Sequence, residues 1–170
     1  MTIANPPFIS TPPGGGPRHL DFHPSNKFLY VNNEMGMSVT AFEWLGGGKT
    51  KEIQTISTLT RPPTDADTTS QIEVHPTGKF LYVANRGEND ITSFAIDQST
   101  GKLTLIGQTP VEGKIPRHFA IDPSGKWLIV ANQGDDKVVV LKIDEKTGAL
   151  SSTGNVVMLK QPMCVLYYPR

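Results

Sequence analysis

The sequence predicts an all-β fold of the β-propeller type, with about three and a half blades of four antiparallel strands each. One phrase returns three times, as "HPSNKFLYVNN", "HPTGKFLYVAN" and "DPSGKWLIVAN", with its prolines at Pro24, Pro76 and Pro123. These prolines are separated by 52 and 47 residues, and each period holds four short runs rich in β-branched and aromatic residues. No helical periodicity is visible, so repeated antiparallel sheets are expected.

A β-sandwich is the main alternative, because it also gives short strands separated by turns about every 8 to 12 residues. A sandwich does not predict the return of one phrase at a fixed spacing, whereas a propeller does. Blades of the WD type are disfavoured because no pair of "GH" and "WD" signatures marks the copies. The repeat therefore favours the propeller.

The elements follow from the repeat in order. Residues 1–16, rich in proline and glycine, are expected to form a connector. The blades are expected at residues 17–60, 68–111 and 115–160. A last innermost strand is expected at residues 162–169, where "PMCVLYYP" begins the phrase a fourth time.

Turn chemistry separates the strands within each blade. In the second blade the expected strands are residues 70–75, 79–85, 90–96 and 102–109. The first two strands are joined through Gly78, which can take a positive φ angle, and Asn26 is the best substitute in the first blade. The last two strands are joined by "DQSTGKL", where an aspartate accepts hydrogen bonds from turn amides.

Composition and charge exclude several classes of function. Sixteen basic and sixteen acidic residues balance, so the chain has no global field that would attract nucleic acid or an anionic membrane. The single cysteine, Cys164, rules out an internal disulfide and suits a cytoplasmic protein. No ligand set for a metal is visible, and no cofactor is expected. The opening residues lack the basic and apolar regions of a signal peptide.

Long stretches of the chain resemble the seven-bladed lactonase family, which includes propeller-type 6-phosphogluconolactonases and fungal carboxymuconate cyclases. The stretches are "GPRHLDFHPSNKFLYVNNE", "KFLYVANRGENDITSFAID", the run from "TGKLTLIGQ" to "VVVLKID", and the closing "QPMCVLYYP". The resemblance implies a seven-bladed ring of about twice this length, of which this chain is the C-terminal half. It implies that the chain is a fragment whose last strand closes the ring against a blade in the other half.

Two arginine–histidine pairs occupy equivalent places in the repeat, where an innermost strand enters the central channel. They are Arg18 with His19 and Arg117 with His118. Two guanidinium groups facing one channel would bind a phosphate or carboxylate group. The alternative is that each arginine only pairs with a neighbouring blade.

Glu34 follows the second strand of its blade, where the sister copies have Arg86 and Gln133, while the asparagine before this position is constant. A position that varies among copies can carry a site rather than maintain a blade. In the carboxymuconate cyclases the arginine of a "GPRH"-like segment and the acid after the next strand are suggested active-site residues, and Arg18 and Glu34 match them. A plain solvated charge is the alternative for Glu34.

His23 and His75 precede the turn prolines, where the third copy has Asp122. A residue that aspartate can replace at a turn is expected to cap the turn by hydrogen bonds rather than act as a catalyst. On this interpretation, the substitution His23→Asp should have almost no effect.

The resemblance implies an enzyme that hydrolyses 6-phosphogluconolactone in the pentose phosphate pathway. In this hypothesis Arg117 and Arg86 hold the substrate, Arg18 stabilises the oxyanion, and His19, His118 or Glu34 is the general base. The alternatives are a carboxymuconate cycloisomerase-like enzyme that uses Glu34 as a proton shuttle, and a non-catalytic interaction module. The expected partners are a small anionic sugar lactone and either a second copy or the N-terminal half.

Overall fold

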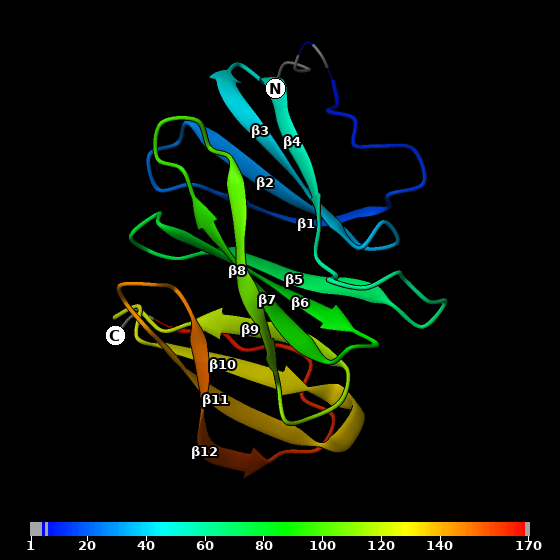
Figure 1. The fold of residues 1–170 in the computed structure, drawn as a ribbon, viewed down its shortest axis with the longest axis vertical. Coiled ribbons are helices and arrows are strands. Elements are labelled where there is room, and N and C mark those ends of the chain that lie inside the picture. Colours follow the sequence, from blue (N-terminus) through cyan, green and yellow to red (C-terminus); the bar gives the residue numbers. More distant parts are fainter. Residues whose placement is uncertain (1–4, 6, 169–170) are drawn as a thin grey trace.

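The computed structural model describes residues 5 and 7–168, and within them it contains three four-stranded antiparallel sheets. Consecutive strands are neighbours in every sheet, so each sheet is a simple meander (Figure 1). The first sheet consists of β1 (Pro17–Phe22), β2 (Phe28–Asn33), β3 (Ser38–Gly46) and β4 (Lys49–Ser57). The predicted all-β, blade-like architecture is confirmed.

The second and third sheets repeat this pattern. The second contains β5 (Thr68–Val74), β6 (Phe80–Arg86), β7 (Asp90–Ile96) and β8 (Leu103–Pro110). The third contains β9 (Pro116–Ile121), β10 (Trp127–Asn132), the short 3-10 helix η1 (Gln133–Asp135), β11 (Lys137–Ile143) and β12 (Leu150–Met158). The first strands of the sheets lie side by side, because β5 contacts both β1 and β9. These three inner strands therefore lie next to one another, with β5 between β1 and β9.

The turn between the first two strands of each blade has the predicted chemistry. Asn26, Gly78 and Gly125 have φ angles of 56°, 74° and 74°. This left-handed backbone conformation is readily available to glycine and, among the other residues, most often to asparagine. The repeated phrase therefore encodes the same tight turn three times.

The turn histidines do more than cap their own turns. His23 Nε2 donates to the carbonyl oxygen of Gly78 in the next blade at 3.0 Å, and its Nδ1 accepts from the Ser25 amide at 3.1 Å. His75 makes the equivalent bond to the carbonyl oxygen of Gly125 at 2.8 Å. Each of these histidines therefore joins two blades as well as closing a turn.

We expect His23→Asp to lower the free energy of unfolding by about 1–2 kcal/mol, because a carboxylate cannot donate to the Gly78 carbonyl. This revises the expectation of a silent substitution. Asp122 at the equivalent turn accepts from backbone amides and has no following blade in this chain. Urea unfolding measures the change, and His75→Asp should cost a similar amount. Unchanged stability in both variants would contradict the role.

The three blades form an arc, and equivalent residues of the repeat show that the free face of the first blade is exposed. Ile72 and Val74 on β5 are buried against the first blade, with 2% and 6% of their surface exposed. The matching residues on β1, Leu20 and Phe22, are 56% and 37% exposed. The face of the first blade that points away from the second blade therefore exposes apolar positions whose equivalents in the second blade are buried.

The third blade, at the other end of the arc, also exposes an apolar residue that the repeat buries in the other blades. Phe28 and Phe80 are 5% exposed, since each packs toward the following blade. The equivalent Trp127 in the last blade is 39% exposed. Both ends of the arc thus expose apolar side chains that the repeat buries elsewhere.

The two terminal segments contain no strand in their described parts. Residues 7–16 run beside the first blade, and Pro12 accepts a hydrogen bond from the Gly15 amide at 3.0 Å. Residues 162–168 return to the inner strands, where the Val165 amide lies 3.5 Å from His118 Nδ1. The expected closing strand at residues 162–169 stays a prediction, since residues 162–168 form no strand with the sheets that the structure describes. Pro169 lies outside the described residues.

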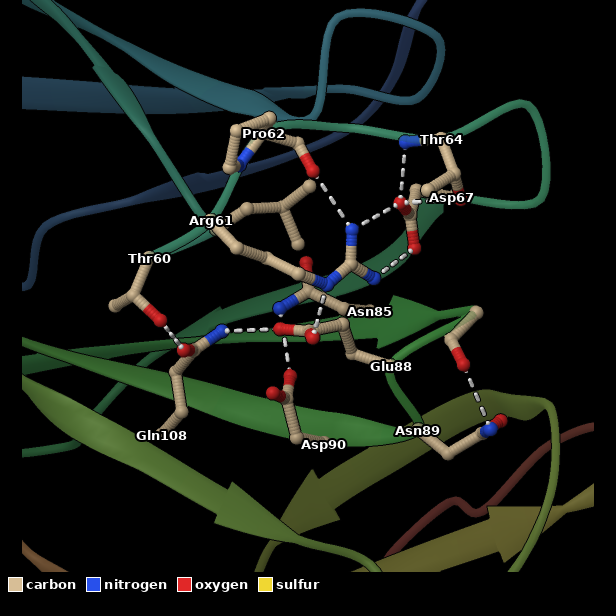
Figure 2. Close-up of polar contacts among 12 residues, drawn as sticks. Thr60, Arg61, Pro62, Thr64, Asp67, Asn85, Glu88, Asn89, Asp90 and Gln108 are labelled. Carbon is tan, nitrogen blue, oxygen red and sulfur yellow. Dashed lines mark hydrogen bonds and ion pairs between the residues drawn. The ribbon is translucent and has the colours of Figure 1, made fainter.

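A polar cluster fixes the linker between the first and second blades (Figure 2). Arg61 donates to both carboxylate oxygens of Asp67, at 2.8 and 2.9 Å, and to Glu88 at 2.5 Å. These contacts hold the pKa of Asp67 well below its ordinary value. Burial raises the pKa of the nearby Asp90 to about 6. Of the two partners of Arg61, Asp67 lies in this linker and Glu88 lies in the turn between β6 and β7. The cluster is therefore a structural contact between the linker and this turn.

Candidate functional site

Three charged residues from the first two blades meet where β1, β2 and β6 come together: Arg18, Glu34 and Arg86. Arg86, at the end of β6, donates through Nη2 to Glu34 Oε1 and to the carbonyl oxygen of Thr69 at 3.0 Å. Arg18 on β1 lies on the other side of Glu34, with 3.8 Å between its Nε and Glu34 Oε2. The structure therefore brings Arg18, Glu34 and Arg86 together, and Glu34 is paired rather than solvated alone.

The charges in this cluster do not balance. Burial is the main cause that lowers the pKa of Arg18, and the positive charges of Arg86 and Arg117 lower it further, while Glu34 opposes them. Arg117 on β9 is half-buried and close enough to contribute to this field. Two guanidinium groups pair with Glu34, and the charge of a third, Arg117, acts on Arg18, so the group has a positive excess that favours an anionic ligand.

Two buried donor atoms of the cluster have no partner among the described residues. They are Arg18 Nη1 and Arg86 Nε. Buried polar groups are normally hydrogen-bonded, so unpaired buried donors need an explanation. An anion bound between the arginines would satisfy such donors.

The two predicted histidines also lie together, next to the arginines. The ring centroids of His19 and His118 are 6.5 Å apart with an edge-to-face angle of 64°. Burial lowers the pKa of His118, and the neighbouring charges of His19 and Arg18 add to this effect. The lowered pKa favours the neutral ring of His118, which can take part in proton transfer or hydrogen bonding.

Sequence reasoning missed one residue of this group, Gln71 on β5. Its Oε1 lies 2.5 Å from His19 Nδ1. Gln71 occupies the same repeat position as His19 and His118, so aligning the three copies could have identified it as a neighbour of these histidines. Ser70, which replaces arginine in the second copy, is fully buried and donates to the Pro116 carbonyl at 2.5 Å, so it joins blades instead.

A cavity of about 400 Å³ lies next to the histidines, between β1, β5, β9 and residues 165–167. Two carboxylates face it, Asp21 and Glu73. Asp21 accepts from the Val74 amide at 2.7 Å, and Glu73 accepts from the Ile121 amide at 3.2 Å. Each carboxylate thus joins its inner strand to the next one. Burial raises the pKa of Glu73 to about 8, and the charge of Asp21 adds to the rise.

We expect Glu73→Gln to remove the loss of stability that develops as pH rises from 4.5 to about 8. A raised folded-state pKa means that the folded protein keeps a proton that the unfolded chain releases above its ordinary pKa of 4.5. The stabilisation is complete below that ordinary value and disappears as pH rises toward about 8. Urea unfolding at pH 6 and pH 9 should show a larger drop in the wild type than in the variant. Glu145→Gln at an exposed turn is the control, and an identical pH dependence of Glu73→Gln and wild type would contradict the assignment.

The comparisons with known proteins agree with this architecture. Residues 1–167 match the model of the family described as lactonase, seven-bladed β-propeller. The chain belongs to the seven-bladed β-propeller lactonase family. The match covers nearly the whole chain, so the blades, the arginine cluster and the histidine pair all lie inside the family region.

Members of the lactonase family with similar sequences are named 6-phosphogluconolactonase. That of Bacillus subtilis is 41% identical over 108 residues, which are 63% of this chain and 31% of that protein. That of Formosa agariphila is 40% identical over 121 residues, covering 70% and 34%. The structure of the Pseudomonas aeruginosa periplasmic gluconolactonase matches with a TM-score of 0.88 and 34% identity, covering 94% of this chain and 44% of that one. The chain therefore spans about a third to under a half of the length of these relatives.

Among the described residues, no helix is long and apolar enough to cross a bilayer. The described part of the chain also holds no group of three or more histidine, cysteine, aspartate or glutamate side chains arranged to bind a metal ion. A cytoplasmic location stays a prediction, and one similar protein is named as periplasmic.

Proposed function

We propose that this chain forms part of an enzyme that hydrolyses an anionic sugar lactone, with 6-phosphogluconolactone of the pentose phosphate pathway as the substrate. The observation that carries the proposal is the half-buried arginine cluster with its positive excess and its two buried, unpaired donor atoms. The names of the similar proteins support the same reaction class.

The arrangement of the cluster suggests a separate role in binding or catalysis for each of its charged residues. Arg86 and Arg117 hold the phosphate group of the substrate, since guanidinium groups bind phosphate oxygens in pairs. Arg18 faces the carbonyl oxygen and stabilises the charge that develops on it in the transition state. The partly exposed side chain of Glu34 orients Arg18 and Arg86 through its ion pairs.

The general base is then a histidine. Both carboxylate oxygens of Glu34 are engaged by arginines, Oε1 by Arg86 and Oε2 by Arg18, so neither oxygen is free to face a water molecule. This pairing also disfavours the cycloisomerase alternative, in which Glu34 carries a proton. His19 and His118 lie beside the cluster and are the remaining candidates.

The proposal is tested by the turnover of freshly prepared 6-phosphogluconolactone, measured against its spontaneous hydrolysis. The chain alone and the chain mixed with a separately produced N-terminal half of a family member are compared. We expect turnover only in the mixture, and slower turnover of the lactone that lacks the phosphate. A closed ring that does not accelerate hydrolysis would favour the non-catalytic alternative. Turnover by the chain alone would show that its own residues suffice.

A further inference from the structure

Hydrogen bonds distinguish the four histidines of the chain by which ring nitrogen carries the proton. A carbonyl oxygen can only accept, so His23 and His75, which contact the carbonyls of Gly78 and Gly125 through Nε2, carry the proton there. Their Nδ1 atoms accept from the backbone amides of Ser25 and Thr77. Both turn histidines are therefore Nε2–H tautomers.

His118 has the same tautomer for a different reason. Its Nδ1 accepts from the amide of Val165, at 3.5 Å, and an acceptor nitrogen carries no proton in the neutral ring. The proton of neutral His118 is then on Nε2. This leaves an N–H donor on a half-buried ring next to His19.

His19 is the exception. Its Nδ1 lies 2.5 Å from Oε1 of Gln71, and the amide oxygen can only accept, so the proton of the neutral ring is on Nδ1. Its Nε2 keeps a free lone pair, since the one ring hydrogen bond of His19 among the described residues is made through Nδ1. Among the histidines, His19 alone presents an unprotonated Nε2.

The backbone around His19 is held by Asn32 of the same blade, and Asn32 in turn bonds to the neighbouring blade. The His19 amide donates to Asn32 Oδ1 at 2.9 Å, and Asn32 Nδ2 donates to Thr69 Oγ1 at 2.8 Å and to the Ser70 carbonyl at 3.3 Å. Asn32 is fully buried. Gln71 follows these residues on β5, so one strand fixes both the backbone and the ring of His19.

We propose that Gln71 is a positioning residue that holds His19 as the Nδ1–H tautomer, so that Nε2 of His19 is the general base for water; this rests on the proposed lactone hydrolysis. Nε2 takes a proton from water as the water oxygen bonds to the lactone carbonyl carbon. The ring C–O bond then breaks, and the proton passes from Nε2 to the departing ring oxygen. The product is the open-chain hydroxy acid, and His19 returns to its starting state.

His118 complements this assignment. As a neutral ring with its proton on Nε2, it donates a hydrogen bond without adding a positive charge beside His19. A neutral donor next to the base keeps the lone pair of the base available. The two adjacent rings thus have opposite tautomers and opposite roles.

Nitrogen-15 NMR of the histidine rings in this chain tests the tautomer directly, at a pH where the rings are neutral. We expect His23, His75 and His118 to show a protonated Nε2, and His19 a protonated Nδ1. In Gln71→Leu the acceptor is lost, so His19 should move to a mixture of tautomers. Gln71→Glu keeps an acceptor at that place and should restore the Nδ1–H form.

Gln98→Leu is the matched control, because Gln98 bonds to the carbonyls of Gly78 and Ile96 and not to His19. Its spectrum should leave the His19 signals in place. A wild-type His19 with its proton on Nε2, or a Gln71→Leu spectrum identical to wild type, would overturn the proposal. The wild-type measurement needs no variant to fold. An Nδ1–H His19 in a closed ring without lactone turnover would overturn the proposed function and leave the tautomer assignment standing.

Discussion

The 170-residue chain is expected to self-associate at micromolar concentration. Leu20 and Phe22 at one end of the arc, and Trp127 at the other, are exposed although the repeat buries their counterparts. If association covers about 1,000 Å² of apolar surface in total, the gross gain is about 25 kcal/mol. The cost of association is about 4–15 kcal/mol, so a net attraction remains.

Light scattering between 5 and 100 µM measures the effect, with 18.5 kDa as the monomer mass. The double variant Leu20→Asp with Phe22→Asp should shift the mass toward the monomer. Leu105→Asp is the control, because Leu105 is 42% exposed on the outer strand β8 and lies on neither end face. A monodisperse wild-type monomer over the whole range would contradict the expectation.

The strands were predictable because the repeat shows the same local pattern three times. The strands expected at residues 79–85 and 90–96 agree with β6 and β7 to within one residue at each end. Local propensity and turn chemistry determine these elements, and both are written in short windows of sequence. The strand expected at residues 162–169 stays a prediction, because the resemblance pairs it with a distant blade, and a short window of sequence does not encode such a pairing.

The site was only partly predictable, because its contacts cross between blades. The pair of Glu34 with Arg86 spans 52 residues, and the bond of His19 to Gln71 also spans 52. Equivalent repeat positions indicated that such residues lie at the same height on neighbouring inner strands. They did not indicate which side chains are in contact. The same limit applies to His23, whose bond to the next blade cannot be inferred from Asp122 in a blade that has no successor here.

Arg18→Ala and Arg117→Ala in the closed ring are expected to reduce kcat/KM by roughly 30- to 1,000-fold each. Such losses correspond to about 2–4 kcal/mol of transition-state stabilisation, the usual effect of removing a charged donor from a desolvated site. Arg18 is the more sensitive of the two, because it lies between Glu34 and the histidines and its buried Nη1 has no other partner among the described residues.

Arg61→Ala distinguishes a site role from a structural one, since Arg61 in the linker between blades pairs with Asp67 in the same linker and with Glu88 in the turn between β6 and β7. Its loss should lower the thermal stability and leave kcat/KM within about threefold of wild type, because a structural contact acts on folding. The site variants should show the reverse, with nearly unchanged melting temperatures and a large loss of turnover. If Arg18→Ala instead behaves like Arg61→Ala, the arginine cluster joins blades and the anion site lies elsewhere in the ring.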